Sequence, residues 1–160
     1  MAGVSIKNLT RRSLRSERRV FSAIVEEVLP GWDISLVFVD AKKARALNEK
    51  LRGKKYVPNV LSYIVGEKGA EIIICPSEAK KQAPDYNLQP TTYNLYLFIH
   101  GVLHIKGWAH GATMERCERN LLAKFVAGNA RKKQNETTHR HRHRYRHVPG
   151  KNGRRRGALR

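Results

Sequence analysis

Three histidines lie close together in the sequence with the spacing expected of ligands to one metal ion. His100 and His104 are four residues apart, so on a helix their side chains leave the same face. Gly107 tolerates a positive φ, which ends a helix and lets the chain turn back so that His110 can approach the other two. Three neutral imidazoles leave the fourth position of a zinc ion open, which is typical of a catalytic zinc that lowers the pKa of its bound water to about 7.

The alternative is that each histidine is an ordinary residue of the core or surface. The segment before the first histidine, Leu95 to Ile99, is strongly apolar, so His100 and His104 are predicted to lie on a buried helix. Unpaired imidazoles are costly there. The spacing and the apolar context together favour the metal site.

The same spacing, H-x-x-x-H-x-x-G-x-x-H, occurs in metzincin peptidases. Those enzymes need a glutamate directly after the first histidine as their general base. Here that position is Gly101, which has no side chain to move a proton. The motif therefore keeps the metal ligands and lacks the peptidase base.

Three ordered stretches resemble the YbeY family, bacterial rRNA maturation factors regarded as metal-dependent, single-strand-specific endoribonucleases. Residues 100–110 are similar to the family signature H-G-x-L-H-L-x-G-Y-D-H. Residues 47–63 resemble L-N-x-x-[YF]-R-x-x-D-x-x-T-[ND]-V-L-S-F, and residues 70–75 resemble G-D-I-x-I-[SC]. The resemblance covers most of residues 35–125.

The chain departs from the family pattern at several positions. Ala109 stands where the family has an aspartate that can orient a ligand, and such partners tune metal affinity by about 10–100-fold. Pro58 replaces a threonine, Lys55 stands near the usual aspartate, and Ala70-Glu71 replaces Gly-Asp. All three histidines and Arg52 are retained, which favours a divergent active member over an inactive one.

The resemblance implies roles for residues outside the histidine motif. It brings Arg52 to the mouth of the metal cleft, where a guanidinium can bind the charge of a phosphodiester transition state in a bidentate manner. Without the resemblance, Arg52 would be read as an ordinary surface arginine. Lys54 and Lys55 are expected to contact the RNA backbone, Ser62 to line the cleft and Asn59 to lie in a turn. No carboxylate stands out as a general base.

The resemblance also implies a reaction and its partners. We expect one Zn²⁺ ion, single-stranded or precursor rRNA as substrate, and the small ribosomal subunit and its proteins as partners, with cleavage at the 3′ end of 16S rRNA. The alternative is a non-catalytic ribosome-assembly factor that binds rRNA and uses the metal structurally. A metallohydrolase with another substrate remains a third reading, because a fold and a metal do not name a substrate.

Composition agrees with one catalytic domain. The chain has 160 residues and a net charge of +19, which suits a polyanionic substrate. Its two cysteines, Cys75 and Cys117, are too few for a disulfide framework. The sequence shows neither a long apolar run nor the pattern of a secretory signal at its N-terminus, so we expect a cytoplasmic protein that does not bind membranes.

The C-terminal segment, residues 131–160, is more basic than the rest. It carries twelve basic residues and one acid, and the domain of residues 1–130 holds the other twenty basic and twelve acidic residues. Histidine and arginine alternate without hydrophobic periodicity, which predicts a disordered basic tail. The alternatives for it are a solvated tail or one whose histidines collect stray metal. We favour RNA binding through phosphate neutralisation and base stacking, by Arg140, Arg142, Arg144 and Arg146.

Hydrophobic periodicity predicts an α+β fold in which a small β-sheet packs with helices and the histidine helix lies in the core. Asp40 is the expected N-cap of the second helix, and the residues from Gly66 to Gly69 are expected to join two strands. The predicted helices are residues 12–29, 41–51, 77–83, 92–106 and 113–126, the last stopping at Gly128, and the predicted strands are residues 33–39, 60–65 and 70–75.

Overall fold

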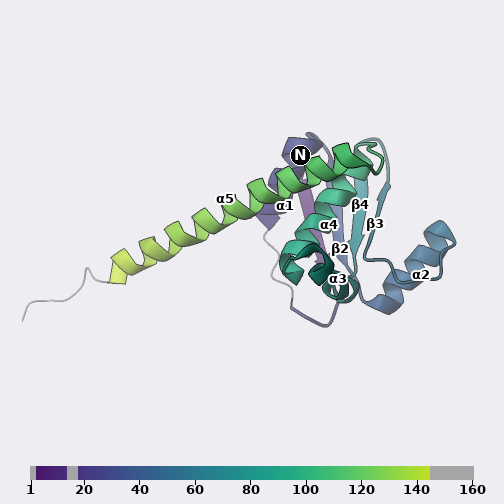
Figure 1. The fold of residues 1–160 in the computed structure, drawn as a ribbon, viewed down its shortest axis with the longest axis horizontal. Coiled ribbons are helices and arrows are strands. Elements are labelled where there is room, and N and C mark those ends of the chain that lie inside the picture. Colours follow the sequence, from purple (N-terminus) through teal and green to yellow (C-terminus); the bar gives the residue numbers. More distant parts are fainter. Residues whose placement is uncertain (1–2, 14–17, 145–160) are drawn as a thin grey trace, which may run out of the picture. The chain divides into compact units, whose positions relative to one another are not determined.

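Strands and helices alternate as far as residue 64, and the elements that follow residue 74 are all helical (Figure 1). The computed structural model of the protein describes the backbone of residues 3–13 and 18–144 and the side chains of these residues as far as residue 128. The elements in chain order are β1 (Gly3–Asn8), α1 (Arg18–Val28), β2 (Asp33–Phe38), α2 (Ala41–Arg52), β3 (Val60–Ile64), β4 (Gly69–Ile74), α3 (Pro76–Gln82), the 3-10 helix η1 (Ala83–Tyr86), α4 (Pro90–Ile105) and α5 (Ala112–Arg144). The chain divides into two units, Met1–Ala127 and Gly128–Arg160.

The four strands form one mixed sheet with the order β1-β2-β4-β3. Strands β1, β2 and β4 run parallel, and β3 is antiparallel to β4. The predicted connection between the apolar runs at 60–65 and 70–75 is therefore a hairpin, with Leu61 opposite Ile73. The α+β class is confirmed.

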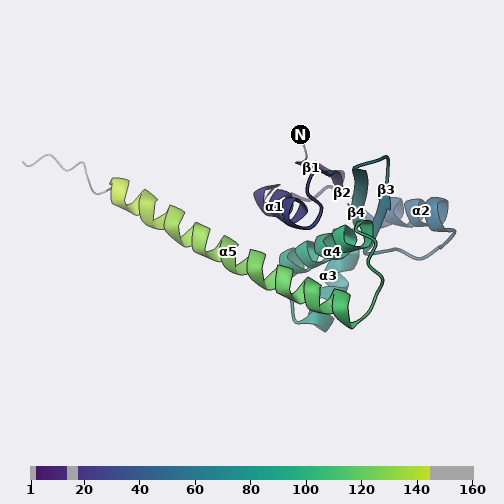
Figure 2. The same ribbon diagram turned by 90° about the horizontal axis from the view of Figure 1, so that it is seen from above.

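Both faces of the sheet are covered, because successive side chains of a strand point to opposite faces. Ile34, Leu36 and Ile72 face the main core, which they share with buried residues of α1 and α4. Figure 2 shows these two helices on the same side of the sheet. Val37 and Ile73 face a smaller cluster on the opposite side, formed with α2. The sheet is thus a rigid middle layer that fixes α2 and α4.

Helix α4 is the histidine helix and is buried against the sheet. It begins at Pro90, whose missing N–H costs nothing in the first turn, and half of its residues are buried. At Gly101 an added Cβ would lie 3.2 Å from side-chain atoms of Ile72, which is itself fully buried. The residue after the first histidine therefore faces the sheet. The position that holds a general base in metzincins is used here for close helix–sheet packing.

This packing predicts opposite effects for the same substitution at two helical glycines. Gly101→Ala gains up to about 1 kcal/mol of helix propensity, but overpacking costs about 1–3 kcal/mol, so the free energy of unfolding should fall. Gly128→Ala meets no atom within 4 Å and should leave stability unchanged or raise it. Urea denaturation of the two variants measures the difference. An equal response of both variants would contradict the packing at Gly101.

Several element boundaries differ from the sequence-based prediction. Strand β1 was not predicted, because its short alternation of apolar and polar residues is a weak signal. Cys75 is the N-cap of α3, without a side-chain hydrogen bond, so this helix begins at Pro76 rather than at the predicted residue 77. The predicted cap of α2 is confirmed, since Asp40 accepts a hydrogen bond from the backbone N–H of Lys43 at 2.8 Å.

The sequence predicted that the last helix stops at Gly128. Helix α5 instead continues to Arg144. Residues 131–144, for which the alternation of histidine and arginine predicted disorder, therefore have a helical backbone. Extending an existing helix needs no new nucleus, and lysine, arginine and glutamine are good helix formers, so the missing hydrophobic period does not prevent a helix. The part of the tail from residue 145 onward lies outside the described residues. Among the described residues, no helix is both long and apolar enough to cross a membrane.

Candidate metal centre

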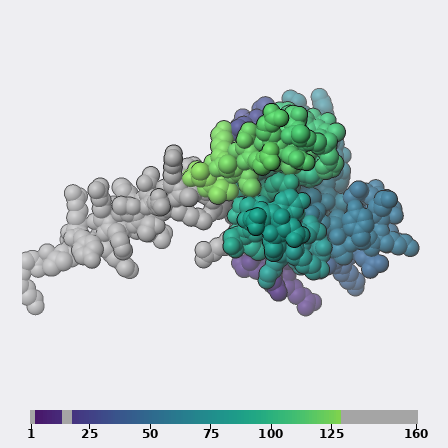
Figure 3. Space-filling view, viewed as in Figure 1, coloured from purple at the N-terminus to yellow at the C-terminus, as the bar shows by residue number. Residues whose placement is uncertain are grey.

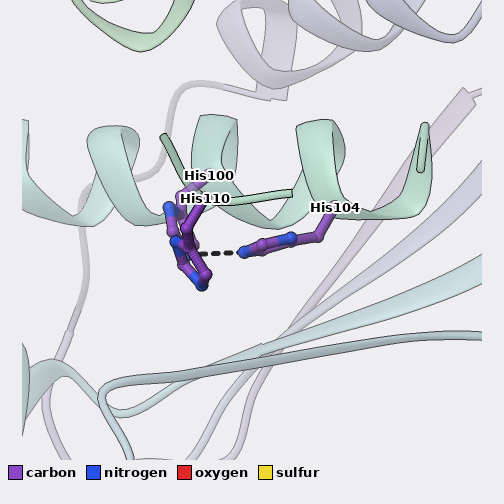
Figure 4. A group of neighbouring side chains, drawn as sticks. All are labelled: His100, His104 and His110. Carbon is purple, nitrogen blue, oxygen red and sulfur yellow. Dashed lines mark hydrogen bonds between the residues drawn. The ribbon is translucent and has the colours of Figure 1, made fainter. Parts of the chain in front are cut away.

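Helix α4 and the turn that follows it bring the three histidines together (Figure 4). His100 and His104 lie one helical turn apart on α4, which ends at Ile105. Gly107 has φ 95°, which confirms its predicted role as the residue that ends the helix. The chain then turns, so that His110 precedes α5 and its ring lies with the other two. Each of the three residues offers one ligand nitrogen, and these nitrogens all lie within 4.8 Å of one another.

Hydrogen bonds to the Nδ1 atoms fix how two of the rings present their other nitrogen. Nδ1 of His104 donates to the backbone carbonyl of Trp108 at 3.0 Å, and Nδ1 of His100 donates to the Glu118 carboxylate at 2.6 Å. The Nε2 atoms of the two histidines lie 3.0 Å apart. In the neutral rings both Nε2 atoms then carry lone pairs that face each other with no proton between them.

This arrangement fits a bound cation. Zinc binds histidine nitrogen at about 2.0–2.1 Å, so two nitrogens on one ion lie at most roughly 4.2 Å apart. The 3.0 Å separation of His100 and His104 satisfies that limit. Burial, with a further contribution from the charge of neighbouring His100, lowers the pKa of His104 and favours the neutral form that metals bind. The three-histidine group can hold a metal ion.

Glu118 is a part of the centre that the sequence analysis missed. Its side chain is 3% exposed, and its two oxygens accept hydrogen bonds from His100 and from the Tyr96 hydroxyl at 2.6 and 2.9 Å. Burial alone would raise the pKa of this carboxyl group, but the two hydrogen bonds and the histidine charges outweigh burial, and the pKa is lowered. A sequence signal was present, because Glu118 lies on the buried stripe of α5 between Met114 and Leu121.

The carboxylate of Glu118 orients the ring of His100 and raises its basicity as a ligand. We therefore predict that Glu118→Gln weakens metal binding by about 10–100-fold. The matched control is Glu115→Gln on the same helix, because Glu115 is exposed. Competition with a metal-chelating dye measures both affinities. Equal affinities of the two variants would show that Glu118 does not support the centre.

The histidines open onto a cleft of about 980 Å³ that Arg52 also lines. Arg52 is the last residue of α2, and the loop that follows it leads into β3. In Figure 3 the blue residues of α2 and this loop form a lobe beside the teal residues of α3 and α4. The segment around Arg52 thus borders the cleft that the three histidines line. Ser62 lines the cleft, as expected.

Asn59 lies at a bend before β3, which agrees with the expected turn, and it also lines the cleft. Its Nδ2 atom donates to Oε1 of Gln82 at 2.7 Å, and the Tyr93 hydroxyl donates to the same oxygen at 3.3 Å. Glu78, which the sequence analysis did not single out, is an acidic residue in the cleft lining, and its carboxylate pairs with Lys81 at 3.0 Å. These residues come from α3 and α4, which the sequence alone did not place beside β3.

Two of the other predicted RNA-binding residues, Lys54 and Lys55, are absent from the described lining of the cleft. Lys54 and Lys55 are exposed in the loop after α2. Arg140, Arg142 and Arg144 belong to α5, where the backbone alone is described, and Arg146 lies outside the described residues.

The fold and the site define an α+β protein in which a three-histidine group that could hold a metal ion lines a cleft together with an arginine. The family described as "Endoribonuclease YbeY" matches residues 5–126. The chain belongs to this family.

Individual relatives agree with the assignment. The protein named "Endoribonuclease YbeY" of Neisseria meningitidis is 38% identical over 89 residues, which cover 49% of this chain and 52% of that protein. The protein of the same name from Stenotrophomonas maltophilia is 31% identical, with 69% and 78% covered. The chain therefore spans about half the length of the first relative. A solution structure of TM1509 from Thermotoga maritima has the same fold, with a TM-score of 0.61 and 21% identity over 95% of this chain and 99% of that one.

Proposed function

We propose that this protein is a zinc-dependent endoribonuclease that cleaves single-stranded RNA. The observation that carries the proposal is the cleft that holds His100, His104 and His110 together with Arg52. A metal in such an open site acts as a Lewis acid and activates water. The relatives' printed name, "Endoribonuclease YbeY", supports RNA as the substrate.

The chain's own residues supply binding and charge stabilisation in this proposal. Arg52 is exposed at the end of α2, so its guanidinium is free to approach a phosphodiester group in the cleft. Its planar fork matches two phosphoryl oxygens and stabilises the additional negative charge of the transition state. The net charge of +19 favours association with a polyanion.

Within RNA, precursor rRNA is the proposed substrate, at the 3′ end of 16S rRNA, with the small ribosomal subunit and its proteins as partners. The family resemblance is the support for this assignment. The second candidate is a non-catalytic assembly factor that binds rRNA. Ala109 favours it, because the family aspartate that can orient a ligand is absent at this position.

A comparison of two RNA substrates separates the candidates. The zinc-loaded protein is incubated with a single-stranded oligonucleotide and with the same strand in a duplex, and the products are resolved on a denaturing gel. The proposed function predicts internal cleavage of the single strand and little of the duplex. Tight binding of both RNAs without cleavage of either would establish the assembly-factor alternative instead.

We also propose that the four arginines of the basic segment, Arg140, Arg142, Arg144 and Arg146, contact RNA phosphates. Each lost contact on single-stranded RNA should reduce the slope of log K against log salt by about 0.7. Replacing all four with glutamine in the full chain should therefore flatten the slope by up to about 3 and weaken binding at low salt. Fluorescence anisotropy across a salt series measures the slope. An unchanged slope would show that these arginines do not contact the RNA.

A further inference from the structure

Tyr56 combines exposure with a fixed backbone beside the metal centre. Tyr56 is 55% exposed, although tyrosine is large and mostly apolar. It lines the same cleft as the three histidines. Among the phenylalanine, tyrosine and tryptophan residues, it alone appears in the described lining of that cleft. An exposed aromatic ring in a cleft that an arginine also lines has the chemistry of a stacking surface for a nucleobase.

The backbone is held in place at Tyr56 and at the two residues that follow it. The side chain of Asn48, which is 0% exposed, donates a hydrogen bond to the Tyr56 carbonyl at 3.0 Å. Val57 packs on the small cluster between α2 and the sheet, and Pro58 is buried. The backbone of this loop is held in place while the Tyr56 ring is exposed to solvent. Stacking of a base on the ring would therefore cost little conformational entropy.

The ring also lies next to the arginine proposed to bind phosphate. Nη1 of Arg52 donates to the Tyr56 hydroxyl at 3.3 Å. A guanidinium and an aromatic ring thus stand side by side in the cleft, as a phosphate and a base do within one nucleotide. A ring can stack on a base only where the base is not already enclosed in a duplex.

We propose that Tyr56 stacks on an unpaired base next to the phosphate bound by Arg52, and that this contact selects single-stranded RNA. The inference rests on the proposed function and names a residue that determines its specificity. In this proposal Tyr56 contributes to RNA affinity, and its aromatic ring contributes more than its hydroxyl group.

The test measures binding without cleavage. Full-length protein is treated with chelator and titrated with single-stranded RNA oligonucleotides that each carry one abasic nucleotide at a successive position. Loss of one stacked base should weaken binding by the unsubstituted protein about 5–150-fold at one position. Tyr56→Leu should bind the intact RNA more weakly by a similar factor and should show no further loss at that position.

Two more variants separate stacking from other roles. Tyr56→Phe keeps the ring and should retain the position-dependent loss, whereas affinity as low as that of Tyr56→Leu would assign the effect to the hydroxyl and overturn the proposal. Tyr86→Leu is the matched control, since Tyr86 is 50% exposed but is not in the described lining of the cleft, and it should behave as the unsubstituted protein. An identical abasic profile for Tyr56→Leu and the unsubstituted protein would also overturn it. Absence of RNA cleavage by zinc-loaded protein would refute the proposed function and leave this binding profile intact.

Discussion

Replacing His104 with alanine is expected to remove the metal ion from the protein. The ring centroid of His104 lies 4.5 Å from the centroids of both other histidines. Its loss leaves two imidazoles, which cannot form the tripod of an open zinc site. The loss of metal affinity should exceed the 10–100-fold change that follows removal of an orienting partner such as Glu118.

The measurement needs a protein whose tail histidines do not add metal to the count. We suggest the full chain with His139, His141, His143 and His147 replaced by glutamine, analysed by mass spectrometry after dialysis. This protein should hold close to one ion, and His104→Ala in the same background should hold almost none while remaining folded by circular dichroism. Equal metal content in the two proteins would eliminate the tripod assignment.

Arg52→Lys is expected to slow RNA cleavage by about 100–1,000-fold, in the range seen when a donor to a developing negative charge is removed. Lysine retains the positive charge but cannot make the two parallel hydrogen bonds of a guanidinium. RNA affinity should therefore change much less than kcat, and the metal content should not change.

The matched control is Arg45→Lys, because Arg45 is exposed on the same helix and is not in the cleft lining. Single-turnover kinetics with saturating enzyme separates the chemical step from binding. Equal cleavage rates for the two variants would make Arg52 a surface residue with no part in the reaction.

The metal centre was predictable because its geometry is local. His100 and His104 share one helix, and Gly107 reverses the chain within a few residues, so spacing alone defines the tripod. Burial of the histidine helix followed from the apolar residues before His100 for the same reason. Arg52 is far from these residues in the sequence, and the family resemblance rather than periodicity brought it to the cleft.

The parts that sequence reasoning missed depend on contacts between distant segments. The hydrogen bond from His100 to Glu118 joins residues 18 positions apart, and that from Asn59 to Gln82 joins residues 23 positions apart. Neither pair has a spacing that a single helix or strand would reveal. The extent of α5 was missed for the opposite reason, because local helix propensity outweighed the absence of hydrophobic periodicity beyond Gly128.

The most direct test of a metal-dependent endoribonuclease at this centre is cleavage of single-stranded RNA during metal titration. Metal-free protein with the four tail histidines replaced receives zinc in increasing amounts, and the initial cleavage rate is recorded at each step. The account predicts a rate that rises in proportion to added zinc and levels off at about one ion per chain, with no rise for His104→Ala. Full activity before any metal is added, or none at full occupancy, would contradict it.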